Sequence, residues 1–151
     1  MKSIYLSHPF TGNEKNNRKK ARKIATNICK AAKKRKSSIA ILNPCDCIHY
    51  AEEAGLSYEE CVEICLKLID GCDALVLAKG WENSKGCIIE AAYAVYNAKA
   101  IGFLPDKTDD KWNGVITLIQ KNKHFTNILL EKIEKLKIKS LNLKNKTFLN
   151  I

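Results

Sequence analysis

Short apolar runs alternate with longer amphipathic stretches over the first two thirds of the chain. The apolar runs predict four strands, at residues 3–6, 39–42, 73–78 and 100–104. Between these runs, apolar residues recur every three or four positions, which is the spacing of one buried helix face. Strands that alternate with helices form a parallel sheet that helices cover on both faces. The pattern therefore predicts an α/β fold in which helices sandwich a parallel sheet.

Three helices are predicted between these strands. The first has a lysine-rich face opposite an apolar face, whose members are Ala21, Ile24, Ala25, Ile28 and Ala32. The second begins at a capping-box sequence, residues 57–60, and the third covers residues 86–98. Residues 45–56, between the second strand and the second helix, predict a loop.

The pattern changes after residue 104. Residues 106–110 are polar, residues 112–119 form an ambiguous element, residues 125–136 predict a helix, and the tail from Lys137 has no clear period. We therefore predict a single domain over residues 1–104. Residues 105–151 are expected to form a C-terminal helical appendage to it and not an independent domain.

Composition limits the classes of partner. The 151 residues suit one domain that buries roughly two thirds of its unfolded surface. The formal net charge of +10 is concentrated in residues 15–36 and 121–146, and such a surface attracts anions. The first basic stretch interleaves no aromatic residues that could stack on bases, so we interpret it as a solvated helix face. We do not expect a nucleic-acid partner.

Seven cysteines without an N-terminal signal peptide predict free thiols in a reducing cytoplasm, that of a bacterium or of the host if a phage encodes the chain. The pairs Cys45/Cys47 and Cys61/Cys65 lack the C-x-x-C spacing of a structural zinc site. We therefore expect neither a metal nor another cofactor. No run of 18 apolar residues predicts a membrane span.

The segment from Trp81 to Ala94 carries the most chemistry. It follows an apolar run and predicts a polar loop and then a helix that begins near Ser84. Free backbone N–H groups and the helix dipole make such a start a seat for an anion. Glu90, one carboxylate within the first two turns, then faces the ligand as a nucleophile in glycosyl transfer. The alternative is a capped amphipathic helix with a solvent-facing Glu90.

Three predicted loops, residues 7–13, 43–56 and 79–85, leave the carboxyl ends of strands. In an open parallel sheet these ends meet at one edge, where ligands bind. We therefore expect the three loops to converge on one site. His8 in the first loop fits either a ligand contact or a simple turn before proline.

Four blocks carry a resemblance to a known family: residues 5–12, Asn43-Pro44, Cys72-Asp73, and residues 80–90. Together they resemble the phage and bacterial domains classed as domain of unknown function 4406, within the nucleoside 2-deoxyribosyltransferase-like superfamily. The resemblance covers about residues 1–104. It implies a flavodoxin-like (Rossmann-like) sheet and a homo-oligomer, a dimer or higher, in which a neighbouring subunit completes each active site.

The resemblance also implies residue roles. In the characterised enzymes a glutamate at the position of Glu90 attacks C1′ of a 2-deoxynucleoside, and the sugar passes to another base or to water. Ser84 stands where relatives that hydrolyse 5′-monophosphates place a phosphate-binding serine, whereas base-exchanging transferases place an aspartate. Glu90 is thus the candidate catalytic residue. The candidate substrate-binding residues are Tyr5, Ser7, His8, Gly12, Pro44, Tyr58, Trp81, Asn83, Ser84 and Gly86.

One departure from the family leaves two hypotheses open. The characterised enzymes use an aspartate eight residues before the strand-opening aspartate, which is Asp73 here, and that position holds Cys65. A thiol is a poor acid for protonating a leaving base at neutral pH. The chain is therefore expected to be a nucleotide N-glycosidase or deoxyribosyltransferase, or else a protein that binds a nucleotide or nucleotide-derived signal without turnover. Asp73 itself is expected to be structural.

Overall fold

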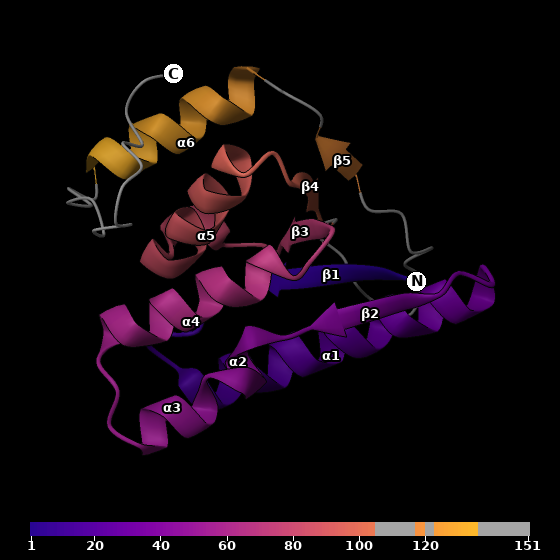
Figure 1. Ribbon diagram of the computed structural model, residues 1–151, viewed down its shortest axis with the longest axis horizontal. Coiled ribbons are helices and arrows are strands. Elements are labelled where there is room, and N and C mark those ends of the chain that lie inside the picture. The colour runs from indigo at the N-terminus through magenta and orange to yellow at the C-terminus, as the bar shows by residue number, and fades with distance from the viewer. Residues whose placement is uncertain (105–116, 120–122, 136–151) are drawn as a thin grey trace.

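The computed structural model describes residues 1–104, 117–119 and 123–135 (Figure 1). Its elements, in chain order, are β1 (Lys2–Ser7), α1 (Glu14–Lys34), β2 (Ile39–Leu42), α2 (Pro44–Cys47), α3 (His49–Glu53), α4 (Tyr58–Asp70), β3 (Ala74–Leu77), the 3₁₀ turn η1 (Trp81–Asn83), α5 (Lys85–Tyr96), β4 (Ala100–Phe103), β5 (Thr117–Ile119) and α6 (Lys123–Lys135). The four predicted strands are confirmed, as is the capping box of α4, where Ser57 Oγ accepts a hydrogen bond from the Glu60 backbone N–H.

The strands form one sheet in the order β2-β1-β3-β4-β5. β1 to β4 are parallel, and β5 pairs antiparallel with β4. The order is that of the flavodoxin-like fold, and its direction reverses between β1 and β3. The predicted α/β, flavodoxin-like architecture is thus confirmed, and the ligand crevice of such a fold lies beyond the ends of β1 and β3.

Helices cover both faces of the sheet, with α1 on one and α4, α5 and α6 on the other (Figure 1). Successive side chains of a strand point to opposite faces. Leu6 of β1 therefore packs with Ile28 of α1, whereas Tyr5 packs with the core of α4 and α5. By the same alternation Ser7 lies on the Tyr5 side, beneath α5.

The predicted loop over residues 45–56 is wrong, because this segment contains the short helices α2 and α3. Pro44 at the start of α2 presets its first turn. Helices of four or five residues are too short to be stable alone, so tertiary contacts must hold them. From α1, the Arg18 guanidinium donates to the Cys45 carbonyl (3.2 Å), and that of Arg22 donates to Asp46 (2.8 Å).

The described part of the C-terminal region packs on the core of the first 104 residues. The predicted helix is confirmed as α6, and the ambiguous element at residues 112–119 includes β5. Phe125 of α6 is buried, with its ring 5.6 Å from that of Trp81 and 5.5 Å from that of Phe103. The polar stretch at 106–110 and the tail from Lys137 lie outside the described residues. Among the helices that the structure describes, none has the length and apolar composition needed to cross a bilayer.

Candidate functional site

Glu90 lies in the second turn of α5, buried against the end of β1. Its side chain is only 7% exposed. Oε1 accepts a hydrogen bond from the Tyr5 hydroxyl (2.7 Å), and Oε2 accepts one from the Ser7 hydroxyl (2.6 Å). The solvent-facing alternative for Glu90 is therefore wrong. We call Tyr5, Ser7 and Glu90 the cavity floor.

Burial dominates the electrostatics of this carboxyl group. Desolvation raises the pKa of Glu90 from the 4.5 of an exposed glutamate to about 7, against the opposing effect of hydrogen bonds from Ser7, Tyr5 and the Cys65 thiol. Acid and carboxylate forms are thus both populated near neutral pH. The perturbed group lies at the switch point of the sheet, which is the combination expected of a functional carboxyl.

A cavity of about 240 Å³ opens over the floor. The first loop, α2, α3, α4 and the start of α5 line it, so the segments that follow β1, β2 and β3 all contribute. Its apolar lining includes Phe10, Ile48, Leu56 and Val62. The cavity therefore joins one buried carboxyl to a wall suited to a flat apolar group.

The amino end of α5 forms one rim of the cavity. Ser84 is the N-cap, and its hydroxyl accepts a long hydrogen bond (3.4 Å) from the Cys87 N–H. A Cβ on Gly86 would lie 3.6 Å from the Tyr58 hydroxyl, and Lys85 Nζ lies 5.1 Å from the centre of the Tyr58 ring. Helix dipole, free N–H groups and a nearby cation all favour an anion at this rim.

Comparison with known protein families finds a match to this part of the chain. Residues 2–103 match the family model described as "Domain of unknown function (DUF4406)". The chain therefore belongs to the DUF4406 family. No curated protein matches the chain, and neither does any solved structure. The matched residues run from β1 to β4 and include every residue that lines the cavity.

In this DUF4406 domain the predicted site residues divide into three groups. Six line the cavity: His8, Pro44, Tyr58, Ser84, Gly86 and Glu90. Tyr5 and Ser7 are fully buried and hold Glu90. Gly12, Trp81 and Asn83 lie outside the cavity lining: Gly12 shapes the turn before α1 with a φ of +94°, Trp81 packs in the core against Phe125, and Asn83 is exposed.

His8 at the cavity lining is held by its own backbone neighbour. Its Nδ1 lies 2.7 Å from the Pro9 carbonyl oxygen, which favours the tautomer with the proton on Nδ1 and leaves Nε2 as an acceptor. Burial lowers the pKa of His8, and the charge of Lys20 lowers it further. We therefore treat His8 as a neutral group at neutral pH.

Four thiols, those of Cys45, Cys61, Cys65 and Cys87, line the same cavity. Burial, and then the charge of Glu90, raise the pKa of both Cys45 and Cys87 to about 12 and raise that of Cys65 further. The thiols of Cys45, Cys65 and Cys87 are thus protonated and poor nucleophiles. Among the described residues no three His, Cys, Asp or Glu side chains are grouped as ligands of a metal ion.

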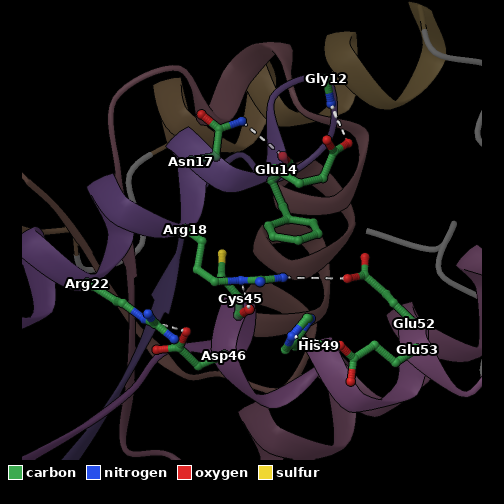
Figure 2. A network of polar contacts seen from close by, with 11 residues as sticks. Gly12, Glu14, Asn17, Arg18, Arg22, Cys45, Asp46, His49, Glu52 and Glu53 are labelled. Atoms are coloured by element: carbon green, nitrogen blue, oxygen red, sulfur yellow. Dashed lines mark hydrogen bonds and ion pairs between the residues drawn. The ribbon is translucent and has the colours of Figure 1, made fainter.

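We call the part of the cavity lining that α2 and α3 provide the outer wall. It belongs to the segment at residues 43–56 that the sequence predicts to reach the site, and it includes predicted Pro44, but sequence reasoning missed its two helices and Glu52. Glu52 of α3 lines the cavity, and Arg18 Nη2 lies 3.8 Å from its Oε2. The Arg18 guanidinium also lies 5.4 Å from the centre of the Phe10 ring. Figure 2 shows Arg18 reaching from α1 toward Glu52, while Arg22 meets Asp46. Arg18 precedes buried Ala21 by three residues, so helical spacing could have placed it inward.

Asp73 has the structural role that the sequence predicts. At the start of β3, away from the cavity, its Oδ2 accepts hydrogen bonds from the backbone N–H (2.7 Å) and hydroxyl (3.0 Å) of Ser3. These bonds lower the pKa of Asp73. They join the start of β1 to the start of β3.

Proposed function

We propose that this DUF4406 domain cleaves the N-glycosidic bond of a nucleoside or deoxynucleoside 5′-phosphate, as an N-glycosidase or a 2-deoxyribosyltransferase. The carrying observation is the buried carboxyl of Glu90, held by two hydroxyl donors at the switch point of the sheet and open to a cavity. The resemblance to nucleoside 2-deoxyribosyltransferase-like enzymes supports the same reaction class.

In the proposed reaction, a Glu90 oxygen attacks C1′ as the C1′–N bond breaks. The base leaves with the bonding electron pair and takes up a proton, and the sugar remains as an ester on Glu90. Water or a second base then attacks C1′ and regenerates the carboxylate. Tyr5 and Ser7 orient the two carboxylate oxygens, so that the nucleophile has a fixed direction before substrate arrives.

Charge sets the proposed orientation of the substrate. The 5′-phosphate lies at the amino end of α5, near Ser84, Gly86 and Lys85, because that rim carries the dipole and the cation. With C1′ above Glu90, the base then extends toward Phe10 and the outer wall. The proposal includes a homo-oligomer, in which a neighbouring subunit closes the site. It also includes a location in a reducing cytoplasm, which keeps all seven cysteines as thiols.

A second candidate is a protein that binds a nucleotide without turnover. The observation that favours it is Cys65, which lines the same cavity as Glu90 and stands where the characterised enzymes have an acid. Because the pKa of its thiol is raised, Cys65 cannot protonate a leaving base at neutral pH. In this reading Glu90 is a recognition group.

One experiment separates the two candidates. The full chain is incubated with nucleosides, 5′-monophosphates and dinucleotides, and mass spectrometry follows both free base and retained ligand. The enzyme hypothesis expects base release that Glu90→Gln lowers by about 10⁴-fold or more, as when other covalent nucleophiles are removed. Retention of an intact nucleotide without release by either protein supports the binding hypothesis. Base release by Glu90→Gln at the parent rate would contradict the role of Glu90.

A further inference from the structure

We infer that Glu52 of the outer wall recognises the amino group of a nucleobase, so that the substrate class is a nucleotide of cytosine, adenine or guanine and not of uracil or thymine. The inference rests on the proposed function, because it assumes that the cavity holds a nucleotide with C1′ above Glu90. It adds a specificity-determining residue at the far end of the same cavity.

The position of Glu52 follows from the path of the chain. α3 follows β2, whereas Glu90 belongs to α5, which follows β3; both side chains line one cavity. A carboxylate repels a phosphate, so the anionic end of a nucleotide belongs at the α5 rim and its base at the outer wall. Phe10, Ile48 and Leu56 provide apolar surface for the faces of a base there. The edge of that base then meets Glu52.

Arg18 forms an ion pair with Glu52. The Arg18 guanidinium donates a hydrogen bond from Nε to the Cys45 carbonyl (3.2 Å), and its Cζ lies 5.4 Å from the centre of the Phe10 ring. Contacts with α2 and with the first loop therefore both position it. From there Nη2 reaches Oε2 of Glu52 at 3.8 Å. Among the described residues no hydrogen bond is made to Oε1, the other oxygen of the carboxylate. Oε2 of Glu52 thus faces Arg18, as Figure 2 shows, and Oε1 is able to accept a hydrogen bond from a ligand.

Chemistry then selects the base. A carboxylate only accepts hydrogen bonds, and an exocyclic amino group, such as N4 of cytosine, only donates them. Uracil and thymine carry a carbonyl oxygen at that position, which would face the carboxylate acceptor to acceptor. A hydrogen-bonded contact to a base edge typically discriminates against the wrong base by about 1–3 kcal/mol. We therefore expect the nucleotide with the amino base to bind about 10-fold to 100-fold more tightly.

The test measures binding without turnover. Titration calorimetry on the full-length Glu90→Gln protein compares deoxycytidine with deoxyuridine 5′-monophosphate, and deoxyadenosine with deoxyinosine 5′-monophosphate. We expect the amino nucleotide of each pair to bind about 10-fold or more tightly. Adding Glu52→Gln should bring each ratio near one, because an amide both donates and accepts. Adding Glu52→Asp, which keeps the charge, should retain the direction of the preference if the amide variant is unstable.

Glu53→Gln is the matched control. Glu53 is the next residue of α3, is 63% exposed and pairs with His49 at 3.2 Å, outside the cavity lining. The Glu53→Gln variant should leave the affinity ratios of both nucleotide pairs unchanged. If the Glu90→Gln protein binds both nucleotides of each pair equally, or if a folded Glu52→Gln variant keeps the parent ratios, the inference is overturned while the proposed function stands. Where only Glu52→Asp folds, loss of the direction of the preference overturns the inference. If no nucleotide binds to any of these proteins, the proposed function fails and the inference fails with it.

Discussion

The cavity floor and the outer wall are built in different ways. On the floor, Glu90 is buried and receives two hydroxyl donors from a central strand. On the outer wall, Glu52 has a 38% exposed side chain, lies on a five-residue helix and forms one ion pair, with Arg18 at 3.8 Å. The sheet therefore fixes the proposed reactive group, whereas side-chain contacts position the proposed recognition group. Changes to the wall should alter ligand choice, and changes to the floor should alter chemistry and stability.

After the loss of base release expected for Glu90→Gln, the largest effect is expected from adding a carboxyl group beside Glu90. Cys65→Asp places a second carboxyl group in the lining of the cavity to which Glu90 is open. Two carboxyl groups that share a site raise the pKa of one of them, so a proton donor is present at neutral pH. We expect base release to rise by about 10²–10⁴-fold, the usual range for general acid catalysis. Chromatographic measurement of free base from the preferred 5′-monophosphate checks this.

Cys65→Asn is the control, because it is polar and nearly the same size as aspartate but has no acidic proton. It should leave the rate near that of the parent. If aspartate and asparagine change the rate equally, Cys65 is not at the position of a missing acid. Both variants bury a new polar group, so a lower melting temperature for each is expected and does not bear on the assignment.

The next effect contrasts the burial of Glu90 with that of exposed carboxylates. Because burial raises the pKa of Glu90 to about 7 in the folded chain, the folded state binds this proton more tightly than the unfolded state, where the pKa is near 4.5. The stability that this proton provides is fully present below pH 4.5 and is lost as the pH rises through 7. The free energy of unfolding of the parent should therefore fall, relative to that of Glu90→Gln, by about 3 kcal/mol across this window.

Denaturant titrations of both proteins between pH 4 and pH 8 give that difference, in which contributions from other groups cancel. A parallel pH dependence of the two proteins would show that Glu90 ionises like an exposed carboxylate. Because the nucleophile must be ionised, the kcat/KM of the parent should rise over the upper part of the same window, as the pH passes through 7.

The same contrast explains what could be read from the sequence. The position of Glu90 near the carboxyl ends of the parallel strands could be predicted from strand alternation, the cap at Ser84 and helical spacing. Backbone geometry alone determines these positions. The position of Glu52 depends instead on the short helices α2 and α3. Arg18 and Arg22 of α1 contact α2, and Arg18 also contacts α3. Local periodicity has no signal for such helices. The sequence pattern also misses the core packing of Trp81, because its partners Phe103 and Phe125 lie 22 and 44 residues further along the chain.

The smallest expected effect separates two serines with the same local role. Ser84 caps α5 at the cavity rim, and Ser57 caps α4 outside the cavity lining. Ser84→Ala should weaken binding of a 5′-monophosphate to the Glu90→Gln protein by about 1.5–3 kcal/mol, the range for a hydrogen bond to a charged group. The corresponding unphosphorylated nucleoside should lose much less.

Ser57→Ala should remove a cap at a stability cost of about 1 kcal/mol and leave both affinities unchanged. Calorimetric affinities and melting temperatures for the two variants provide the comparison. Equal losses for nucleotide and nucleoside on Ser84→Ala would show that Ser84 acts only as a helix cap, and the phosphate would then have to bind elsewhere on the cavity.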